Sequence, residues 1–318
     1  MLQGYLAIGT TLLLWSGFFL SLKGGANSLL QPADIALCRF LIPALLLLPM
    51  LMKSHSEVNA VPLRYWLGMF VGSGLPYLLV ASSAMHYVPV SHGSALVPGT
   101  LPLFVTSIAV ILFKQPLSTH RIAGLALVLV GIALFVVPNL GSSGNSTETQ
   151  GHLLFLLGSL MWAVFTICAR VANLNPLLTS ATISLASLVT LVIAIGFGWL
   201  PSYLAVTPIS NWPTNGLIGH LLTQGLGAGL IAAFSYLYAV KTLGAERSAA
   251  FGSATPVIAT LLAIPIFSEM PNTITWAALF LVSAGSLVAS NVFLRHDASL
   301  NYQPPSHAVA SSSDESKV

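Results

Sequence analysis

Four polar side chains recur along one long apolar segment, residues 216–240, at spacings that a helix brings onto a common face. They are His220, Gln224, Ser235 and Tyr238. A helix with one polar face and an otherwise apolar surface can line a wet cavity with that face. Histidine can also gain and lose a proton near physiological pH. The segment therefore predicts one wall of a cavity for a polar solute, with His220 as a candidate for coupling to protons.

Two apolar segments earlier in the chain add candidates of the same kind, namely Tyr77, His92, Pro102 and Thr106. A proline inside a helix leaves a backbone carbonyl without its partner, which lipid tolerates only where protein or a water-lined cavity faces it. We therefore expect Pro102 beside a cavity, with a simple packing kink as the alternative. His92 is a second candidate for proton coupling, and both histidines also suit a structural role near the membrane interface.

Aromatic side chains occur in two similar short motifs. Trp15 and Phe18 stand in "LWSGF", and Trp162 and Phe165 stand in "MWAVF". Their depth inside long apolar segments favours a place in the cavity wall. Packing against lipid or in an interfacial aromatic belt is the alternative.

Arg39 is the one basic residue that falls well inside an apolar segment. A charge at the centre of a bilayer costs about 2.5–3.5 kcal/mol on insertion scales, and less near its edge. Asp34, five residues earlier, points to a different side of the helix and is a poor partner. Two interpretations of Arg39 remain open: a structural anchor that reaches the membrane surface, or a group that binds a substrate carboxylate.

Several kinds of site have no counterpart in the sequence. No Asp or Glu lies in the middle of an apolar segment, and we find no metal-ligand spacing, glycine-rich phosphate loop or order of residues typical of a catalytic triad. Basic patches with interleaved aromatic residues, which favour nucleic-acid binding, do not occur either. We expect no cofactor, no metal, no nucleic-acid partner and no enzymatic activity.

The composition defines the solvent in which these residues act. Of the 318 residues, 55% are hydrophobic and 6% are charged, whereas soluble domains carry roughly a quarter charged residues. Runs of about 20 apolar residues match the thickness of a bilayer, and only helices or closed barrels can cross it. The fold class is therefore an all-α polytopic membrane protein.

Proline, glycine and charged residues divide the chain into ten predicted transmembrane helices. Their approximate ranges are 4–22, 33–52, 66–85, 91–113, 121–138, 152–170, 176–200, 216–240, 246–267 and 274–294.

Lysine and arginine in the connecting segments predict the orientation, because they concentrate on the cytoplasmic side. One set of loops, together with the C-terminal tail, holds nine of these residues, and the other set holds only Lys23. The nine are Lys53, Arg64, Lys114, Arg121, Arg170, Lys241, Arg247, Arg295 and Lys317. Both termini are predicted to be cytoplasmic.

An internal repeat appears when the sequence is shifted by 154 residues. "SALVPGTLPLFVTSIAVILF" then lies over "SAAFGSATPVIATLLAIPIF" and pairs Pro102 with Pro256, so that Pro256 joins the cavity candidates. Each half also has a GxxxG pattern, which favours close helix contact. Five helices in each half make the second half inverted, an arrangement typical of secondary transporters with a central cavity.

The repeat and the connecting segments define four parts of the chain. We expect a first five-helix repeat over 1–140, an external linker over 141–151, a second repeat over 152–295 and a disordered cytoplasmic tail over 296–318. The tail is rich in serine and proline and has no apolar period.

Motifs in several of these segments resemble the EamA-type transporters of the drug/metabolite transporter superfamily. They are "LLWSGFF", "LCRFLIPALLLLP", "SLMWAVFTICAR" and "SAAFGSATPVIATLLAIPIFSE", which ends at Glu269. The resemblance covers about residues 4–295. One departure is Lys114-Gln115, where the first half of the family usually ends its fourth helix in Gly-Glu or a similar acid. This departure weakens the idea of paired glutamates as an essential proton carrier.

The resemblance implies two inverted repeats around a central cavity and the export of small metabolites or drugs. We expect a secondary transporter that exports small neutral or zwitterionic metabolites, such as amino acids, by alternating access. A sensor or assembly subunit that has lost transport is one alternative, and a multidrug or cation exporter is another, although no deep carboxylate is present for it. The expected partners are a small-molecule substrate and the lipid bilayer, with the chain a monomer or homodimer in a bacterial inner membrane.

Overall fold

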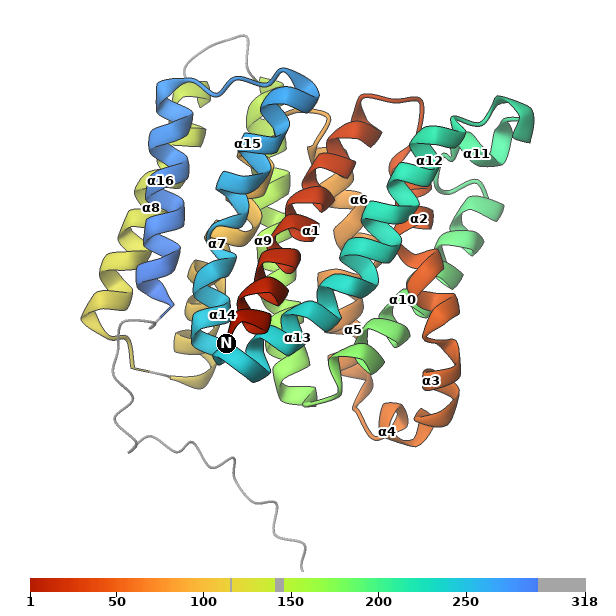
Figure 1. The fold of residues 1–318 in the computed structure, drawn as a ribbon, viewed down its shortest axis with the longest axis horizontal. Helices are drawn as coiled ribbons and strands as arrows, with labels where there is room; N and C mark the ends of the chain where they lie inside the picture. Colours follow the sequence, from red (N-terminus) through yellow and green to blue (C-terminus); the bar gives the residue numbers. More distant parts are fainter. Residues whose placement is uncertain (115, 141–145, 291–318) are drawn as a thin grey trace, which may run out of the picture.

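The computed structural model describes residues 1–114, 116–140 and 146–290 (Figure 1). The predicted tail over 296–318 and the first half of the predicted linker, 141–145, lie outside the described residues. The rest of that linker, 146–151, is already helical.

Every regular element that the structure describes is a helix. In chain order they are α1 (Leu2–Ala26), α2 (Pro32–Leu46), α3 (Leu48–Lys53), α4 (His55–Asn59), α5 (Leu63–Ser73), α6 (Leu75–Ala84), α7 (Val90–Phe113), α8 (Thr119–Leu140), α9 (Ser146–Ala172), α10 (Pro176–Gly196), α11 (Tyr203–Val206), η1 (Ile209–Asn211), α12 (Thr214–His220), η2 (Leu221–Ile231), α13 (Ala232–Leu243), α14 (Ala245–Gly252), α15 (Thr255–Phe267) and α16 (Thr273–Ala289).

Eight helical segments in the described part of the chain are long and apolar enough to cross a membrane. The predicted span 33–52 is instead split between α2 and α3, because Pro49 in the first turn of α3 cannot donate a backbone hydrogen bond. The last predicted span corresponds to α16, which has 17 residues. The number of ten spans and their grouping into two repeats therefore stay predictions.

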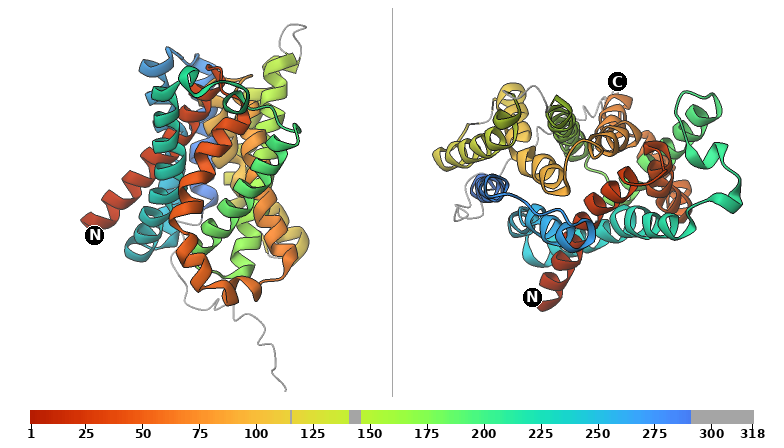
Figure 2. Two further views of the ribbon diagram at one scale, coloured as in Figure 1. Left: turned by 90° about the vertical axis from the view of Figure 1, so that its right-hand side faces the viewer. Right: turned by 90° about the horizontal axis from the view of Figure 1, so that it is seen from above.

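The helices pack in corresponding pairs. α8 lies along α16, α7 packs on α15, and α2 packs on α10. In the first half α5 and α6 pack against α9 of the second half, and correspondingly η2 and α13 of the second half pack against α1 of the first. Figure 1 shows α8 and α16 side by side at one edge of the bundle, and the view from above in Figure 2 shows α1 crossing the bundle obliquely. The bundle thus joins segments that are far apart in the chain.

The two GxxxG patterns lie at close helix contacts. A Cβ atom at Gly72 would overlap the carbonyl oxygen of Met161 in α9. A Cβ atom at Gly225 would lie 2.5 Å from the carbonyl oxygen of Cys38 in α2. Glycine is therefore required at both positions for the backbones to approach this closely.

The segment η2 is a π-helix between two α-helical parts. Its hydrogen bonds span five residues rather than four, so that each residue turns less far around the helix axis than in an α-helix. Residues after η2 consequently face a different side from the one that an uninterrupted α-helix would give them. This change of phase decides which residues of α13 reach the cavity described below.

The ends of the bundle differ in charge. α1 begins and α16 ends at the end where α3, α4, α13 and α14 also lie (Figure 1). The last turns of α3, α9 and α13 carry Lys53, Arg170 and Lys241, and we call this end the basic end. The opposite end holds Lys23, in the last turn of α1, and Glu269, which follows α15.

Candidate functional site

A pocket with a volume of about 350 Å³ lies between α1, α2, α5, α9, α10, η2 and α13. Its walls extend to Leu174, in the connection between α9 and α10 at the basic end, and to Pro176, the first residue of α10. This volume falls within the range of roughly 300–1,000 Å³ that is common for small-molecule sites. The pocket is therefore the candidate site for a substrate.

Aromatic rings form a large part of the pocket wall. Trp15 stands on one side with Tyr236, and their ring centroids are 5.2 Å apart. On the other side, Trp162 and Phe165 pack edge to face at 5.3 Å. Tyr77 lies behind this pair, 5.0 Å from the Trp162 ring. Three of the four aromatic residues in the two similar sequence motifs, Trp15, Trp162 and Phe165, thus meet around one pocket.

Arg39 is the one charged residue among the side chains that line this pocket in the described structure. Its Nη1 atom donates a hydrogen bond to the carbonyl oxygen of Gln224 at 3.2 Å. Its guanidinium also lies over the Phe18 ring, 5.5 Å from the centroid. These contacts hold the guanidinium inside the bundle, beside the pocket.

Gln224 connects the Arg39 contacts to the backbone of α1. Its side chain is fully buried, and its Nε2 atom donates to the carbonyl oxygen of Phe18 at 3.2 Å. Its Oε1 atom has no hydrogen-bond partner among the described residues. Gln224 and Phe18 therefore stand behind the pocket wall, where they position Arg39, and do not themselves line the pocket.

The other candidates from 216–240 lie elsewhere. Ser235 is hydrogen-bonded to Thr11 at 2.8 Å, and the Tyr238 hydroxyl donates to Gln3 at 2.8 Å near the start of α1. Tyr236 lines the pocket in their place. The predicted polar face assumed one α-helical period, and η2 breaks that period between Gln224 and Ser235.

The paired prolines and Thr106 also stand outside the pocket. Pro102 lies inside the continuous helix α7, whereas Pro256 lies in the first turn of α15, where a missing backbone donor costs little. Thr106 is buried and is hydrogen-bonded by Nη2 of Arg121 at 3.3 Å. The break before α15 passes close to Trp15, since a Cβ atom at Gly252 would lie 3.7 Å from its ring.

The two candidate histidines lie in separate places. Nδ1 of His220 is 2.7 Å from the Ser21 hydroxyl, which joins α12 to α1. His92 lies near the start of α7 and contacts His152 and Glu148 of α9. Neither histidine lines the pocket.

Polar contacts join distant segments at the end opposite the basic end. Nζ of Lys23 is 3.2 Å from Oε1 of Glu269 and also donates to the carbonyl oxygen of Val88 at 3.0 Å. Oε2 of Glu269 accepts a hydrogen bond from the backbone N–H of Val90 at 2.8 Å. These contacts hold the end of α1, the start of α7 and the segment after α15 together.

Hydroxyl groups on α10 were missed as candidates from the sequence. Thr179, Ser180 and Ser184 all line the pocket together with Arg39 and the aromatic rings. Their spacing places them along one side of a helix, and that pattern in "PLLTSATIS" was the available signal. The wall is thus more polar than the sequence candidates alone suggested.

Apolar helices of membrane-spanning length, packed in pairs and enclosing a pocket that extends to one end, are an arrangement that suits a membrane carrier. The chain belongs to the EamA-like transporter family, whose family model matches residues 2–137 and 149–291. The chain is therefore a membrane transporter, as the motifs in its sequence predicted.

Individual relatives agree with this assignment. The chain is 28% identical over 277 residues to a protein of Escherichia coli (strain K12) named as the uncharacterized inner membrane transporter YedA, and the match covers 84% of each. It is 22% identical over 286 residues to an uncharacterized transporter of Archaeoglobus fulgidus, covering 88% of this chain and 95% of the relative. A solved crystal structure that is 21% identical aligns over 90% of this chain and 96% of its own, with a TM-score of 0.60, and shows a likeness of fold.

Proposed function

We propose that this chain is a secondary carrier that exports small neutral or zwitterionic metabolites, amino acids in particular, by alternating access. The observation that carries the proposal is the pocket between the two family-matched segments, in which one cationic group faces aromatic and hydroxyl side chains. A carboxylate is the natural partner of Arg39, because a guanidinium can donate two parallel hydrogen bonds to it.

The wall around Arg39 favours a substrate with an apolar body. Trp15, Trp162, Phe165 and Tyr236 offer ring faces against which an apolar or aromatic side chain can pack. A substrate ammonium group could meet the same ring faces or the α10 hydroxyls. The pocket would thus hold a zwitterion with its carboxylate at Arg39 and its ammonium group at the ring faces or hydroxyls.

The charge of the pocket argues against a cation exporter. No Asp or Glu is among the described residues that line it, and Arg39 would repel a cationic drug. A sugar phosphate would require several cationic groups, and a single guanidinium is a weak match for it. A zwitterion suits this pocket better, because it has no net positive charge to be repelled and a single carboxylate for Arg39 to bind.

We place the basic end in the cytoplasm, with both termini there, in a bacterial inner membrane. The asymmetry of lysine and arginine supports this orientation, and the name of the E. coli relative supports the membrane. The described structure would then be closed at the outer end and would receive substrate from the cytoplasm. The pairwise helix packing supports two inverted five-helix repeats whose relative tilt opens each end in turn.

Counterflow in proteoliposomes tests the proposal. Vesicles preloaded with an unlabelled candidate would receive the labelled compound outside, across a panel of neutral and aromatic amino acids, cationic drugs and sugar phosphates. We expect uptake above that of empty vesicles for the zwitterions alone. Ligand binding without counterflow by folded protein would instead identify a sensor, and counterflow of cations alone would refute the substrate class.

A further inference from the structure

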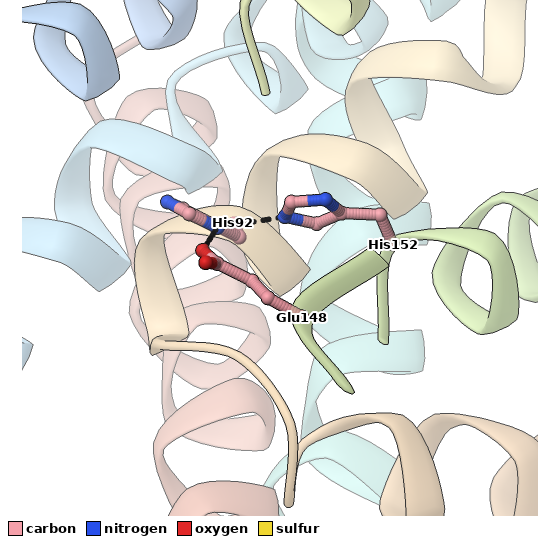
Figure 3. A group of neighbouring side chains, drawn as sticks. All are labelled: His92, Glu148 and His152. Carbon is pink, nitrogen blue, oxygen red and sulfur yellow. Dashed lines mark hydrogen bonds and ion pairs between the residues drawn. The ribbon is translucent and has the colours of Figure 1, made fainter. Parts of the chain in front are cut away.

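Two helices begin near one another at the end opposite the basic end, and each brings ligand-type side chains to the contact. α7 places His92 in its first turn, and α9 carries Glu148 and His152 four residues apart, on one face of the helix. Figure 3 shows the three side chains turned towards a common point. Their ligand atoms all lie within 4.8 Å of one another.

Hydrogen bonds within this group of three side chains cannot satisfy all of the nitrogen and oxygen atoms that face one another. Nδ1 of His92 is 2.9 Å from Nε2 of His152 and 3.3 Å from Oε1 of Glu148. A proton on Nδ1 of His92 can point fully at only one of these acceptors, and a proton on His152 Nε2 leaves His92 and Glu148 facing each other as two acceptors. A hydrogen bond within the group can therefore join two of the three atoms, and the third keeps a lone pair with no proton facing it.

Burial makes this arrangement costly without a further partner. His152 is fully buried, and because its Nδ1 atom has no hydrogen-bond partner among the described residues, Nε2 carries its polar contact, the one to His92. His92 is 8% exposed, while Glu148 is partly open to solvent. Buried polar groups in native proteins are nearly always paired, so each exception requires an explanation.

A metal ion would accept all three lone pairs at once. With bonds of about 2.0–2.1 Å, neighbouring ligand atoms around tetrahedral Zn²⁺ are separated by about 3.3 Å. The distances from His92 to its two partners, 2.9 and 3.3 Å, are close to that value, and binding of an ion would draw Glu148 and His152, whose ligand atoms lie within 4.8 Å, closer together. Two imidazoles and one carboxylate suit zinc and similar first-row metals, whereas Mg²⁺ and Ca²⁺ prefer oxygen ligands alone.

A second, smaller pocket gives access to the group. It has a volume of about 270 Å³, and His92, Glu148, Glu269 and Thr275 are among its lining residues. Two carboxylates face it, and only one of them is paired with Lys23. The remaining negative charge attracts cations, and the pocket leaves room for a water molecule as a fourth ligand.

We propose that His92, Glu148 and His152 bind one divalent first-row transition-metal ion of the zinc class. The ion would tie the start of α7 to the start of α9 at the end opposite the substrate pocket. Nε2 of His92 faces the Thr275 hydroxyl at 3.5 Å, which is the position where a metal-bound histidine usually finds an outer partner. This site is independent of the substrate proposed above.

The test uses the purified full-length chain in detergent, with any polyhistidine tag removed and bound metals stripped by a chelator. Titration calorimetry with Zn²⁺ should show one ion per chain, and Co²⁺ should give the strong visible absorption of a four-coordinate site. Zn²⁺ should also raise the melting temperature, while Mg²⁺ at the same concentration should not.

Variants assign the ion to these residues. Glu148→Gln and His92→Gln should each weaken Zn²⁺ binding at least tenfold and remove the thermal shift. Glu148→Gln is the decisive variant, because its partly exposed side chain can change without disturbing the core. His55→Gln, an exposed histidine of α4, serves as the matched control and should bind as the native chain does. No stoichiometric Zn²⁺ binding by the native chain, or undiminished binding by Glu148→Gln, would overturn the proposal.

Discussion

Lys23 and Glu269 form an ion pair of 3.2 Å that joins the end of α1 to the segment after α15, across 246 residues of sequence. Both side chains are largely buried, with 14% and 17% of their surface exposed. The pair lies at the end opposite the substrate pocket, and Glu269 also holds the first residue of α7. An ion pair in this position is suited to keep one end closed while the other admits substrate.

Glu269→Gln should favour opening of that end. The substitution keeps the shape and an acceptor for Val90 N–H but removes the charge that Lys23 faces. Loss of about 1–2 kcal/mol shifts a two-state equilibrium by a factor of about 5–30. Ser91 lines the small pocket nearby, so a cysteine introduced there by Ser91→Cys, in a chain whose native cysteines are replaced, reports on opening. We expect this cysteine to react several-fold faster with an impermeant maleimide when Glu269→Gln is also present. The same rate with Glu269→Gln as with the control Glu57→Gln would contradict this role.

Arg39→Gln should weaken binding of carboxylate-bearing substrates at least tenfold, since hydrogen bonds to charged groups contribute about 1.5–3 kcal/mol each. Arg39→Lys should recover part of the affinity, because it restores the charge without the planar pair of donors. Affinity is measured by the quenching of tryptophan fluorescence in purified protein. Arg64→Gln, at an exposed position of α5, is the control. Equal losses for the acid and the amide of one ligand would show that Arg39 acts only as an anchor.

Trp15→Ala and Trp162→Ala should each reduce transport more than tenfold or change the preferred substrate, because each removes a ring face from the pocket. Protein abundance in the membrane should stay near that of the native chain. Trp199→Ala provides the control, as that side chain is 72% exposed. Loss of abundance in parallel with transport would mean that the two rings serve packing instead.

Gly72→Ala should destabilise the bundle. Its added methyl group would overlap the backbone of Met161 and the Phe165 side chain, and such overpacking costs about 1–3 kcal/mol. Gly9→Ala is the matched control, since a Cβ atom there meets no other atom within 4 Å. The measurement is the melting temperature in detergent. A similar melting temperature for the two variants would show that α5 and α9 can separate freely.

The repeat found in the sequence has a counterpart in backbone conformation that the sequence did not indicate. Lys114 and Ser268 are 154 residues apart, end α7 and α15, and both have a left-handed conformation, with φ of 50° and 56°. Only few non-glycine residues adopt this conformation, so its recurrence at matched positions strengthens the proposal of two repeats. The residue type gave no signal, because lysine and serine share no preference for it.

Long apolar runs predicted the helices, and the paired aromatic motifs together with Arg39 predicted part of the pocket, whereas side-chain periodicity failed where the helical period itself changed. Trp15, Arg39, Trp162 and Phe165 do share one pocket. Ser235 was placed on the cavity face by extending an α-helical period across η2, which sequence periodicity does not reveal. The proposed metal-binding group was missed for another reason. Glu148 and His152 have helical spacing, but His92 reaches them from a distant helix.

The most direct measurement of the central claim is counterflow of a labelled neutral aromatic amino acid into proteoliposomes that contain the native chain or Arg39→Gln. Unlabelled amino acid and its amide, which lacks the carboxylate, would be added as competitors. We predict counterflow by the native chain that the acid suppresses at least tenfold more strongly than the amide, with this preference lost in Arg39→Gln. Equal competition by acid and amide, or no counterflow by folded native protein, would contradict a carrier that binds the carboxylate of its substrate in this pocket.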